Sequence, residues 1–202
     1  MPRPLFALVL LLVYFALTFG VRTWLQLRRT GATGFAGLSG RPGSAAWFGG
    51  LLFALAMLLA LAAPLAEWYG LVAPLLDPAP ELAELAEHII LLGILGTVAA
   101  QQDMGASWRI GVRPGEHTAL VTTGAFALVR NPIFSLMLLT GLGFALLLPN
   151  PLTLAAFLTL LLAIELQVRG AEEPHLLRVH GDRYRTYARR VGRFLPGLGH
   201  LS

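Results

Sequence analysis

The sequence contains no cysteine and no lysine, and few charged residues of any kind. Of its 202 residues, 13% are charged, about half the share of an ordinary soluble domain, and 56% are hydrophobic. The absence of cysteine excludes disulfide bonds, thiolate catalysis, iron–sulfur clusters and cysteine-based zinc sites. The low charge excludes an ordinary globular enzyme, a disordered tail and a nucleic-acid-binding domain. With a mean hydropathy of +0.69, the chain is predicted to be an integral membrane protein.

Five apolar runs are candidates for membrane-spanning helices, since a crossing needs about 20 mostly apolar residues. A signal peptide is the alternative for the first run, but Arg22 stands where cleavage would occur. Proline ends one helix and can begin the next, so Pro149-Asn150-Pro151 predicts a tight hairpin between the last two runs. We therefore expect an all-α membrane bundle of about five helices, at residues 5–21, 46–66, 88–100, 133–148 and 152–166.

The arginines are distributed unevenly between the two ends of this bundle. Four arginines lie between the first two helices, three between the third and fourth, and seven after the fifth. Arg3 alone falls on the opposite side, together with the acidic loop at residues 67–84. The positive-inside rule then places the N-terminus outside and the C-terminus in the cytoplasm. We expect an integral protein of a bacterial-type cell membrane, with membrane lipids around it and no nucleic-acid partner.

The segment after the fifth helix is too polar to span a membrane. Its apolar residues recur at roughly helical spacing with arginines between them, which predicts an amphipathic helix or helix pair that caps the cytoplasmic end of the bundle. These residues are Leu176, Leu177, Tyr184, Tyr187 and Val191.

Polar residues on the cytoplasmic side concentrate in two stretches, residues 101–132 and 165–196. In the first, Asn131 and Pro132 are typical of a helix start, and a helix N-terminus beside Arg130 can receive a carboxylate or phosphate. In the second, Arg169 precedes Glu172 and Glu173 by three and four residues, so they can share a helix face. The two glutamates are either a solvated helix start or a clamp for hydroxyl or amine groups of a ligand.

Other signals are weaker. Glu165 lies inside an apolar run, where an acid is functional or buried unless it reaches the membrane boundary. The pairs Glu84/His88 and Glu172/His175 have helical metal-ligand spacing, but there is no histidine-rich box, so no metal is expected. No Ser/His/Asp set is arranged for nucleophilic catalysis.

Two stretches resemble a family of membrane enzymes. Leu120–Phe134 resembles the pattern Leu-Val-Thr-Thr-Gly-Pro-Tyr-Arg-Tyr-Val-Arg-His-Pro-x-Tyr, and 172–196 resembles its Glu-Glu-containing tail. Both patterns are typical of the isoprenylcysteine carboxyl methyltransferase and phospholipid methyltransferase group of integral membrane enzymes. The resemblance covers roughly residues 100–197, and it divides the chain into N-terminal membrane helices (1–100) and a methyltransferase-like half (101–202).

The resemblance implies S-adenosyl-L-methionine as methyl donor and a lipophilic or lipid-linked acceptor carrying a carboxylate, thiol or amine. Arg169 and Glu173 are then the candidate catalytic residues, with Arg169 as a substrate anchor. The implied cofactor-binding residues are Thr118, Leu120, Val121, Gly124, Phe126, Arg130, Asn131, Pro132, Phe134 and Glu172.

The chain also departs from the family pattern. Asn131 replaces the family histidine, and Phe126 and Phe134 replace two of its tyrosines. The substrate-side arginine of some members falls on Val168, one step from Arg169. Two alternatives therefore stay open: an NADPH-dependent reductase like the membrane sterol reductases, and a non-catalytic membrane scaffold.

Overall fold

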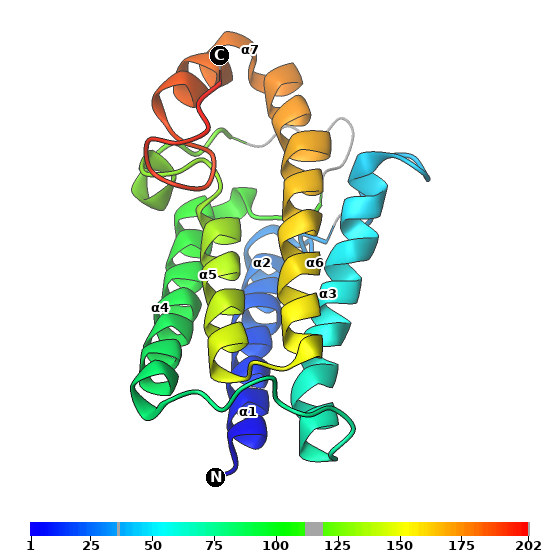
Figure 1. Ribbon diagram of the computed structural model, residues 1–202. Coiled ribbons are helices and arrows are strands. Elements are labelled where there is room, and N and C mark those ends of the chain that lie inside the picture. Colours follow the sequence, from blue (N-terminus) through cyan, green and yellow to red (C-terminus); the bar gives the residue numbers. More distant parts are fainter. Residues whose placement is uncertain (36, 112–118, 202) are drawn as a thin grey trace.

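A computed structural model of the protein describes residues 1–35, 37–111 and 119–201, and the regular structure in these residues is helical (Figure 1). One continuous rod is formed by α1 (Arg3–Phe15), the π-helical segment η1 (Ala16–Val21) and α2 (Arg22–Thr30). A second π-helical segment, η4 (Val168–Glu172), joins α6 to α7. The remaining helices are α3 (Ala45–Trp68), α4 (Pro80–Met104), α5 (Pro132–Leu147), α6 (Pro151–Gln167) and α7 (Glu173–Arg190).

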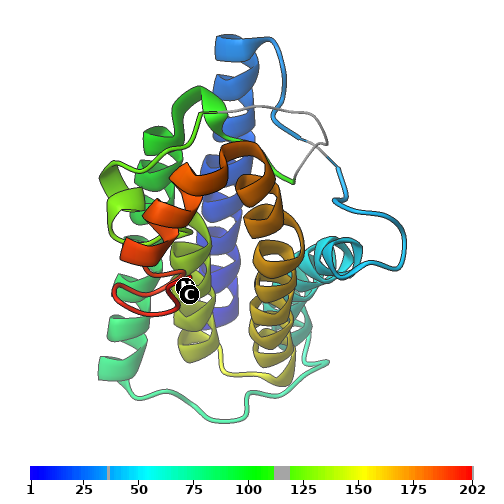
Figure 2. The ribbon, with the colours of Figure 1, turned by 90° about the horizontal axis from the view of Figure 1, so that it is seen from above.

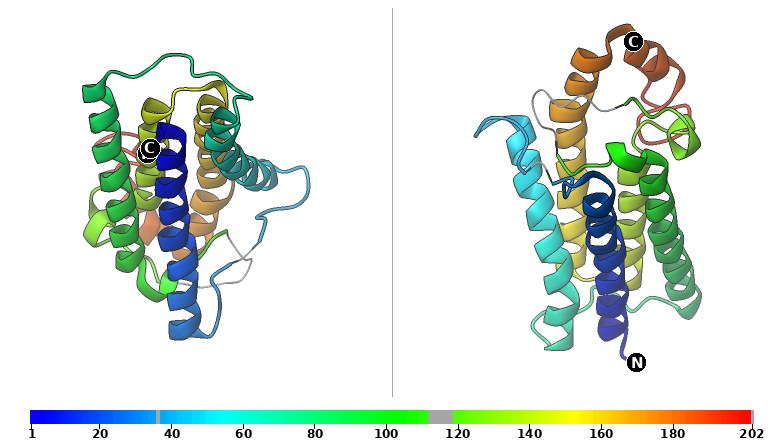
Figure 3. Two further views of the ribbon diagram at one scale, coloured as in Figure 1. Left: turned by 90° about the horizontal axis from the view of Figure 1, so that it is seen from below. Right: turned by 180° about the vertical axis from the view of Figure 1, so that it is seen from behind.

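The helices form a membrane bundle, which confirms the expected fold class. Four helical stretches are long and apolar enough to cross a membrane, and α5 is a shorter apolar helix. The two ends of the chain lie at opposite ends of the bundle, as the view from behind also shows (Figure 3). The protein is therefore an integral membrane protein, while its orientation in the membrane stays a prediction.

The first helix does not end at Arg22, as its charge led us to expect, but continues to Thr30. The side chain of Arg22 is 1% exposed and donates hydrogen bonds to the carbonyl of Gly105 (2.6 Å) and to Gln26 (3.1 Å). Its guanidinium also lies 4.6 Å from the ring centroid of Trp108, a cation–π distance. These neutral partners stabilise the charge within the protein, so the helix passes through the arginine without interruption.

The predicted hairpin between α5 and α6 is confirmed. Asn150 accepts a hydrogen bond from the backbone N–H of Thr153 (2.9 Å) and so caps the start of α6. Its amide nitrogen donates to Glu67 (2.8 Å) at the end of α3, and the Pro149 carbonyl accepts from the N–H of Leu75. The turn therefore also anchors the loop that connects α3 to α4.

Small residues bring the helices close together. Seen along the bundle, α4 lies beside α5 and α3 lies beside α6 (Figure 2). A Cβ atom placed on Gly93 of α4 would lie 2.1 Å from Thr140 Oγ1, and one on Gly143 would lie 2.7 Å from Ile90. The glycines of α4 and α5 thus serve close helix packing, as is usual in membranes.

Replacing Gly93 by alanine is expected to lower the free energy of unfolding by about 1–3 kcal/mol, because the new methyl group overlaps Thr140 in a packed interface. Gly20→Ala is the control, since the nearest atom to its Cβ would be 4.0 Å away. The measurement is the melting temperature of each variant in detergent. Equal melting temperatures for the two variants would contradict the packing argument.

The C-terminal segment folds as the predicted helix pair over one end of the bundle (Figure 1). The two parts of α7 meet at Gly181, whose φ of 52° lies in the left-handed region that glycine adopts most easily. This bend turns the second part of α7 back toward the start of α5, where the Val191 to Arg193 backbone lies beside Val129 and Arg130. Residues 165–196 are thereby brought beside the end of the stretch 101–132, as the distribution of polar residues predicted.

Candidate functional site

A cavity of about 530 Å³ opens at the end of the bundle that α7 covers. This volume is within the range of about 300–1,000 Å³ typical of small-molecule sites. Its wall comes from η1, α3, α4, the start of α5, η4 and α7, and from the segment before α5. The two predicted polar stretches therefore do form one concave site.

Eight of the expected cofactor residues line this cavity: Leu120, Val121, Phe126, Arg130, Asn131, Pro132, Phe134 and Glu172. Gly124 is not in the wall. Its φ of 60° and its contact with Asp103, where a Cβ would lie 2.3 Å from Oδ2, give it a structural role at the start of the short helix η3 (Gly124–Ala127). Thr118 lies outside the described residues.

The start of α5 lies in the cavity wall and has no side-chain cap. Asn131 occupies the N-cap position, as predicted, but its side chain makes no capping bond, in contrast to Asn150 before α6. Its amide nitrogen instead donates to the Arg193 carbonyl (3.2 Å). Pro132 has no N–H, so the first donors are those of Ile133 and Phe134, and both residues line the cavity. Such a helix end favours a bound anion.

Arg130 and Glu173 form a buried ion pair that holds the C-terminal tail against the start of α5. Their side chains are 1% and 8% exposed, with 2.6 Å between Arg130 Nη2 and Glu173 Oε1. Arg193 completes the arrangement by donating two hydrogen bonds of 2.9 Å to the same carboxylate. Arg130 also donates to three backbone carbonyls near the C-terminus, that of Ala188 in α7 and those of Val191 and Gly199 after it. Of the three guanidinium nitrogens of Arg130, Nε is the one that has no partner among the described residues.

The two adjacent glutamates have opposite electrostatic environments. Both lie beyond α6, whose apolar part is the membrane-spanning segment. Burial raises the pKa of Glu172 to about 7, with Glu173 adding to the shift and Arg109 opposing it. Burial also disfavours the charge on Glu173, but hydrogen bonds from Arg193 and Arg130 outweigh it and lower the pKa of that carboxyl. Glu172 therefore faces the cavity ready to change its charge near neutral pH, whereas Glu173 is fixed as an anion.

The two residues expected to be catalytic are not in the cavity wall. Glu173 is enclosed by the arginines just described. Arg169 has a side chain that is 60% exposed, and it forms an ion pair with Glu165 one helical turn earlier. Glu165 lies two residues before the end of α6, away from the centre of its apolar run, and is partly exposed.

Aromatic residues that the sequence analysis did not assign to the site form much of its wall. Tyr184 and Tyr187 of α7 line the cavity, and the Tyr187 hydroxyl donates to the Phe126 carbonyl (2.5 Å). Trp108, which is 3% exposed, lies in the wall as well. The helical spacing of Tyr184 and Tyr187 predicted only an apolar face for α7. The signal that was missed is their tyrosine identity, because a buried tyrosine needs a polar partner.

Both π-helical segments contribute to the same cavity. Thr18 and Phe19 of η1 and Glu172 of η4 are in its wall. Such wide turns are frequent at functional sites, because the extra residue changes which side chains face inward. Within the described residues, no group of three or more possible metal ligands occurs.

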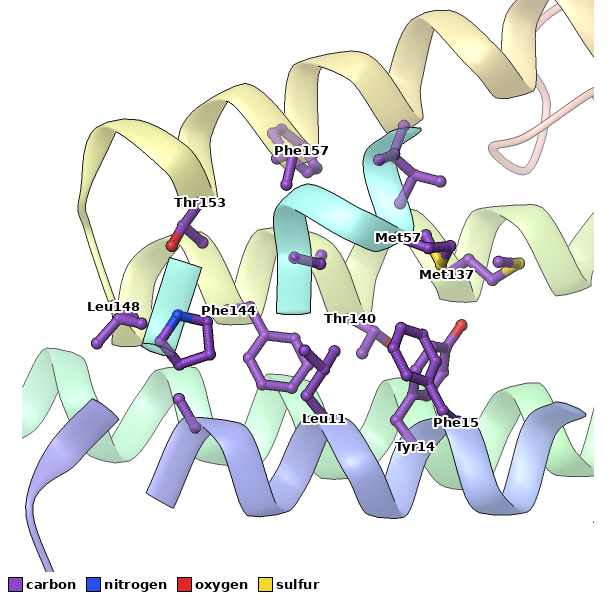
Figure 4. Close-up of a pocket in the computed structure, with 17 residues that line it drawn as sticks. Leu11, Tyr14, Phe15, Met57, Met137, Thr140, Phe144, Leu148, Thr153 and Phe157 are labelled. Carbon is purple, nitrogen blue, oxygen red and sulfur yellow. The ribbon is translucent and has the colours of Figure 1, made fainter. Parts of the chain in front are cut away.

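A second, smaller cavity of about 50 Å³ lies deeper in the bundle between α1, α3, α5 and α6 (Figure 4). Its wall is almost wholly apolar, with Leu148 and Thr153 at one end and Tyr14 and Met137 near the other. Tyr14 and Met137 also line the large cavity. The two cavities are therefore neighbours that share a wall.

Comparisons with known proteins match about half of the chain. A family model described as phospholipid methyltransferase matches residues 84–183. Protein-S-isoprenylcysteine O-methyltransferase B of Arabidopsis thaliana is 31% identical over 110 residues, which is 54% of this chain and 56% of that protein. The nickel-cobalt-cadmium resistance protein NccN of Alcaligenes xylosoxydans xylosoxydans is 31% identical over 117 residues, 56% of this chain and 53% of that protein. The matches thus cover about half the length of these relatives.

Proposed function

Because residues 84–183 match a family model described as phospholipid methyltransferase, we propose that the protein is a membrane methyltransferase of this family that uses S-adenosyl-L-methionine and acts on a lipophilic acceptor. When bound, this cofactor supplies an electrophilic methyl group. The chain must then hold the cofactor, exclude water and align the acceptor. The cavity beneath α7 is the place that we assign to both ligands.

The observation that carries this proposal is the pairing of two opposite charge preferences in one cavity wall. The uncapped start of α5 at Ile133 and Phe134 favours a carboxylate. Glu172 supplies a carboxylate of its own, which favours an ammonium or hydroxyl group. The amino-acid part of the cofactor carries both a carboxylate and an ammonium group. A nicotinamide cofactor carries no such pair.

The remaining lining residues fit the rest of the cofactor. Phe126, Phe134 and Tyr187 present aromatic rings, which suit a flat base and a sulfonium cation. Arg130 Nε, buried and unpartnered among the described residues, is the one donor of that side chain left for a ligand. The replacement of the family tyrosines by phenylalanine leaves these ring faces in place.

We assign positioning to Glu173, because its carboxylate holds Arg130 and Arg193 and so fixes the start of α5. Arg169 would meet only an acceptor group that extends beyond the cavity wall, since its exposed side chain pairs with Glu165. Methyl transfer to a carboxylate or thiolate needs little proton transfer. Alignment of donor and acceptor supplies most of the rate, and we assign this alignment to the cavity beneath α7.

The direct test is calorimetry with detergent-purified protein, S-adenosylhomocysteine as the probe and NADPH as comparator. We expect saturable binding of S-adenosylhomocysteine alone. Binding of NADPH alone would replace the proposal with a reductase, and binding of neither ligand by folded protein would favour a scaffold. Reconstitution in sealed vesicles, with the probe added to one side, would also test the predicted cytoplasmic site.

The affinity for this probe is expected to depend on pH. Glu172 is ionised above its pKa of about 7 and neutral below it. If only the ionised form holds the ammonium group of the probe, the dissociation constant should rise about tenfold between pH 8 and pH 6. Titrations at four pH values measure this directly. A flat profile would show that Glu172 does not contact the charged group.

A further inference from the structure

Two polar side chains of α4 lie in the wall of the large cavity with unsatisfied oxygen atoms. Thr97 and Gln101 are 1% and 4% exposed, and both line the cavity. Within the part of the chain that the structure describes, Thr97 Oγ1 and Gln101 Oε1 have no hydrogen-bond partner. Leaving buried polar atoms unpaired is costly. The two unpaired oxygens are therefore evidence for a ligand group that enters the cavity.

The other buried threonines of the bundle behave differently from Thr97. Thr18 donates to the Tyr14 carbonyl (2.7 Å), and Thr140 donates to the Leu136 carbonyl (2.8 Å), each four residues earlier in its helix. Thr97 makes no such bond, although α4 continues through the residues before it. Its hydroxyl is therefore still available for a ligand.

The amide of Gln101 is held in one orientation. Its Nε2 donates to the Thr18 carbonyl (2.9 Å), which leaves Oε1 as the unsatisfied atom. An amide oxygen only accepts hydrogen bonds. The complementary ligand group must therefore be an O–H or N–H donor, and a carboxylate at this position would be repelled.

The two residues lie at a defined depth. Gly93 packs on Thr140 and Gly96 packs on Leu136, so α4 and α5 run antiparallel in a fixed register. This register places Gln101 level with the start of α5 and Thr97 about one turn deeper, level with Leu136 and Met137. Because Met137 also lines the apolar cavity, Thr97 and Gln101 span the depth from the start of α5 to the edge of that cavity.

We propose that Thr97 and Gln101 bind an O–H or N–H group in the head of the methyl acceptor, whose apolar chain extends toward the cavity of Figure 4. The site then selects amphiphilic alcohols, amines or amides over carboxylates. This inference rests on the proposed function in one respect. It takes the ligand that contacts Thr97 and Gln101 to be the methyl acceptor, and the ligand that contacts the backbone N–H groups of Ile133 and Phe134 to be the cofactor.

The test uses three amphiphiles with the same twelve-carbon chain, 1-dodecanol, dodecyl methyl ether and dodecanoate, titrated into the full-length protein in lipid nanodiscs with empty nanodiscs subtracted. One hydrogen bond separates the first two probes, so the dissociation constant of dodecanol should be about 2- to 10-fold lower than that of the ether. With S-adenosylhomocysteine added to occupy the start of α5, dodecanoate should bind more weakly than dodecanol. In Gln101→Leu and in the isosteric Thr97→Val, the ratio of the dissociation constants of ether and alcohol should fall toward one.

Gln102→Leu is the matched control, because Gln102 is the next residue of α4 and is exposed, and it should keep the preference of the native protein. Equal binding of alcohol and ether by the native protein, binding of neither, or a preference that survives both substitutions would overturn the proposal. A loss of S-adenosylhomocysteine affinity in Gln101→Leu would overturn it as well, by assigning the pair to the cofactor. If the native protein fails to bind S-adenosylhomocysteine, the proposed function fails, while the alcohol preference still tests the pair.

Discussion

Replacing Glu172 by glutamine is expected to weaken the binding of S-adenosylhomocysteine about 10- to 100-fold. The substitution keeps the size of the side chain and removes its charge. A hydrogen bond to a charged group contributes about 1.5–3 kcal/mol, which corresponds to that range of affinity. Calorimetry at pH 8, where the native carboxyl is ionised, measures the full effect.

Glu165→Gln is the control for this experiment. Glu165 lies in the same helical stretch, but it faces Arg169 and does not line the cavity. Its substitution should leave the dissociation constant within about twofold of the native value. The Glu172 variant should also lose the dependence of binding on pH. Equal weakening in both variants, or a retained pH dependence in the Glu172 variant, would remove Glu172 from the site.

The bundle could be predicted from the sequence because a membrane imposes length and composition on each crossing helix. The hairpin at Asn150 and the bent amphipathic tail were likewise readable, since proline, asparagine and helical spacing act locally. Arg22 shows the limit of that reading. Its charge suggested a helix end, but the Gly105 carbonyl and the Trp108 ring, more than 80 residues away, stabilise it within the protein.

The site was predicted in outline, and its internal arrangement was not. Asn131 and Asn150 each precede a proline, yet only Asn150 caps its helix: its backbone is extended (ψ 164°), as an N-cap requires, whereas that of Asn131 is not (ψ 58°). The sequence likewise placed Arg130 and Glu173 in separate motifs, and their pairing depends on a fold that brings together residues 43 apart. Thr97 and Gln101 could have been noticed in the sequence, because both are polar residues near the C-terminal end of an apolar helix.

The largest effect on stability is expected from Glu173→Gln. This change leaves Arg130 and Arg193 without their carboxylate, in a place where Arg130 is 1% exposed. Removing one partner of a buried ion pair costs about 3–5 kcal/mol, because the remaining charge is left uncompensated. The free energy of unfolding should fall by about that amount, measured by thermal or denaturant unfolding in detergent. Asp182→Asn is the control: it breaks an exposed pair with Arg185 and should leave the melting temperature unchanged.

The same variant distinguishes positioning from catalysis. Because Glu173 holds the tail through Arg130 and Arg193, its loss should expose residues 191–201 to proteolysis before the membrane helices unfold. The double variant Glu173→Gln, Arg193→Met removes one of the uncompensated charges and should recover part of the stability. The lowered pKa of Glu173 also fixes how the free energy of unfolding depends on pH. The stabilisation by Glu173 is fully present above the ordinary pKa of 4.5, and it is lost as the pH falls through the lower pKa of the folded state. A variant that keeps native stability and tail protection but loses methyl transfer would instead make Glu173 a catalytic residue.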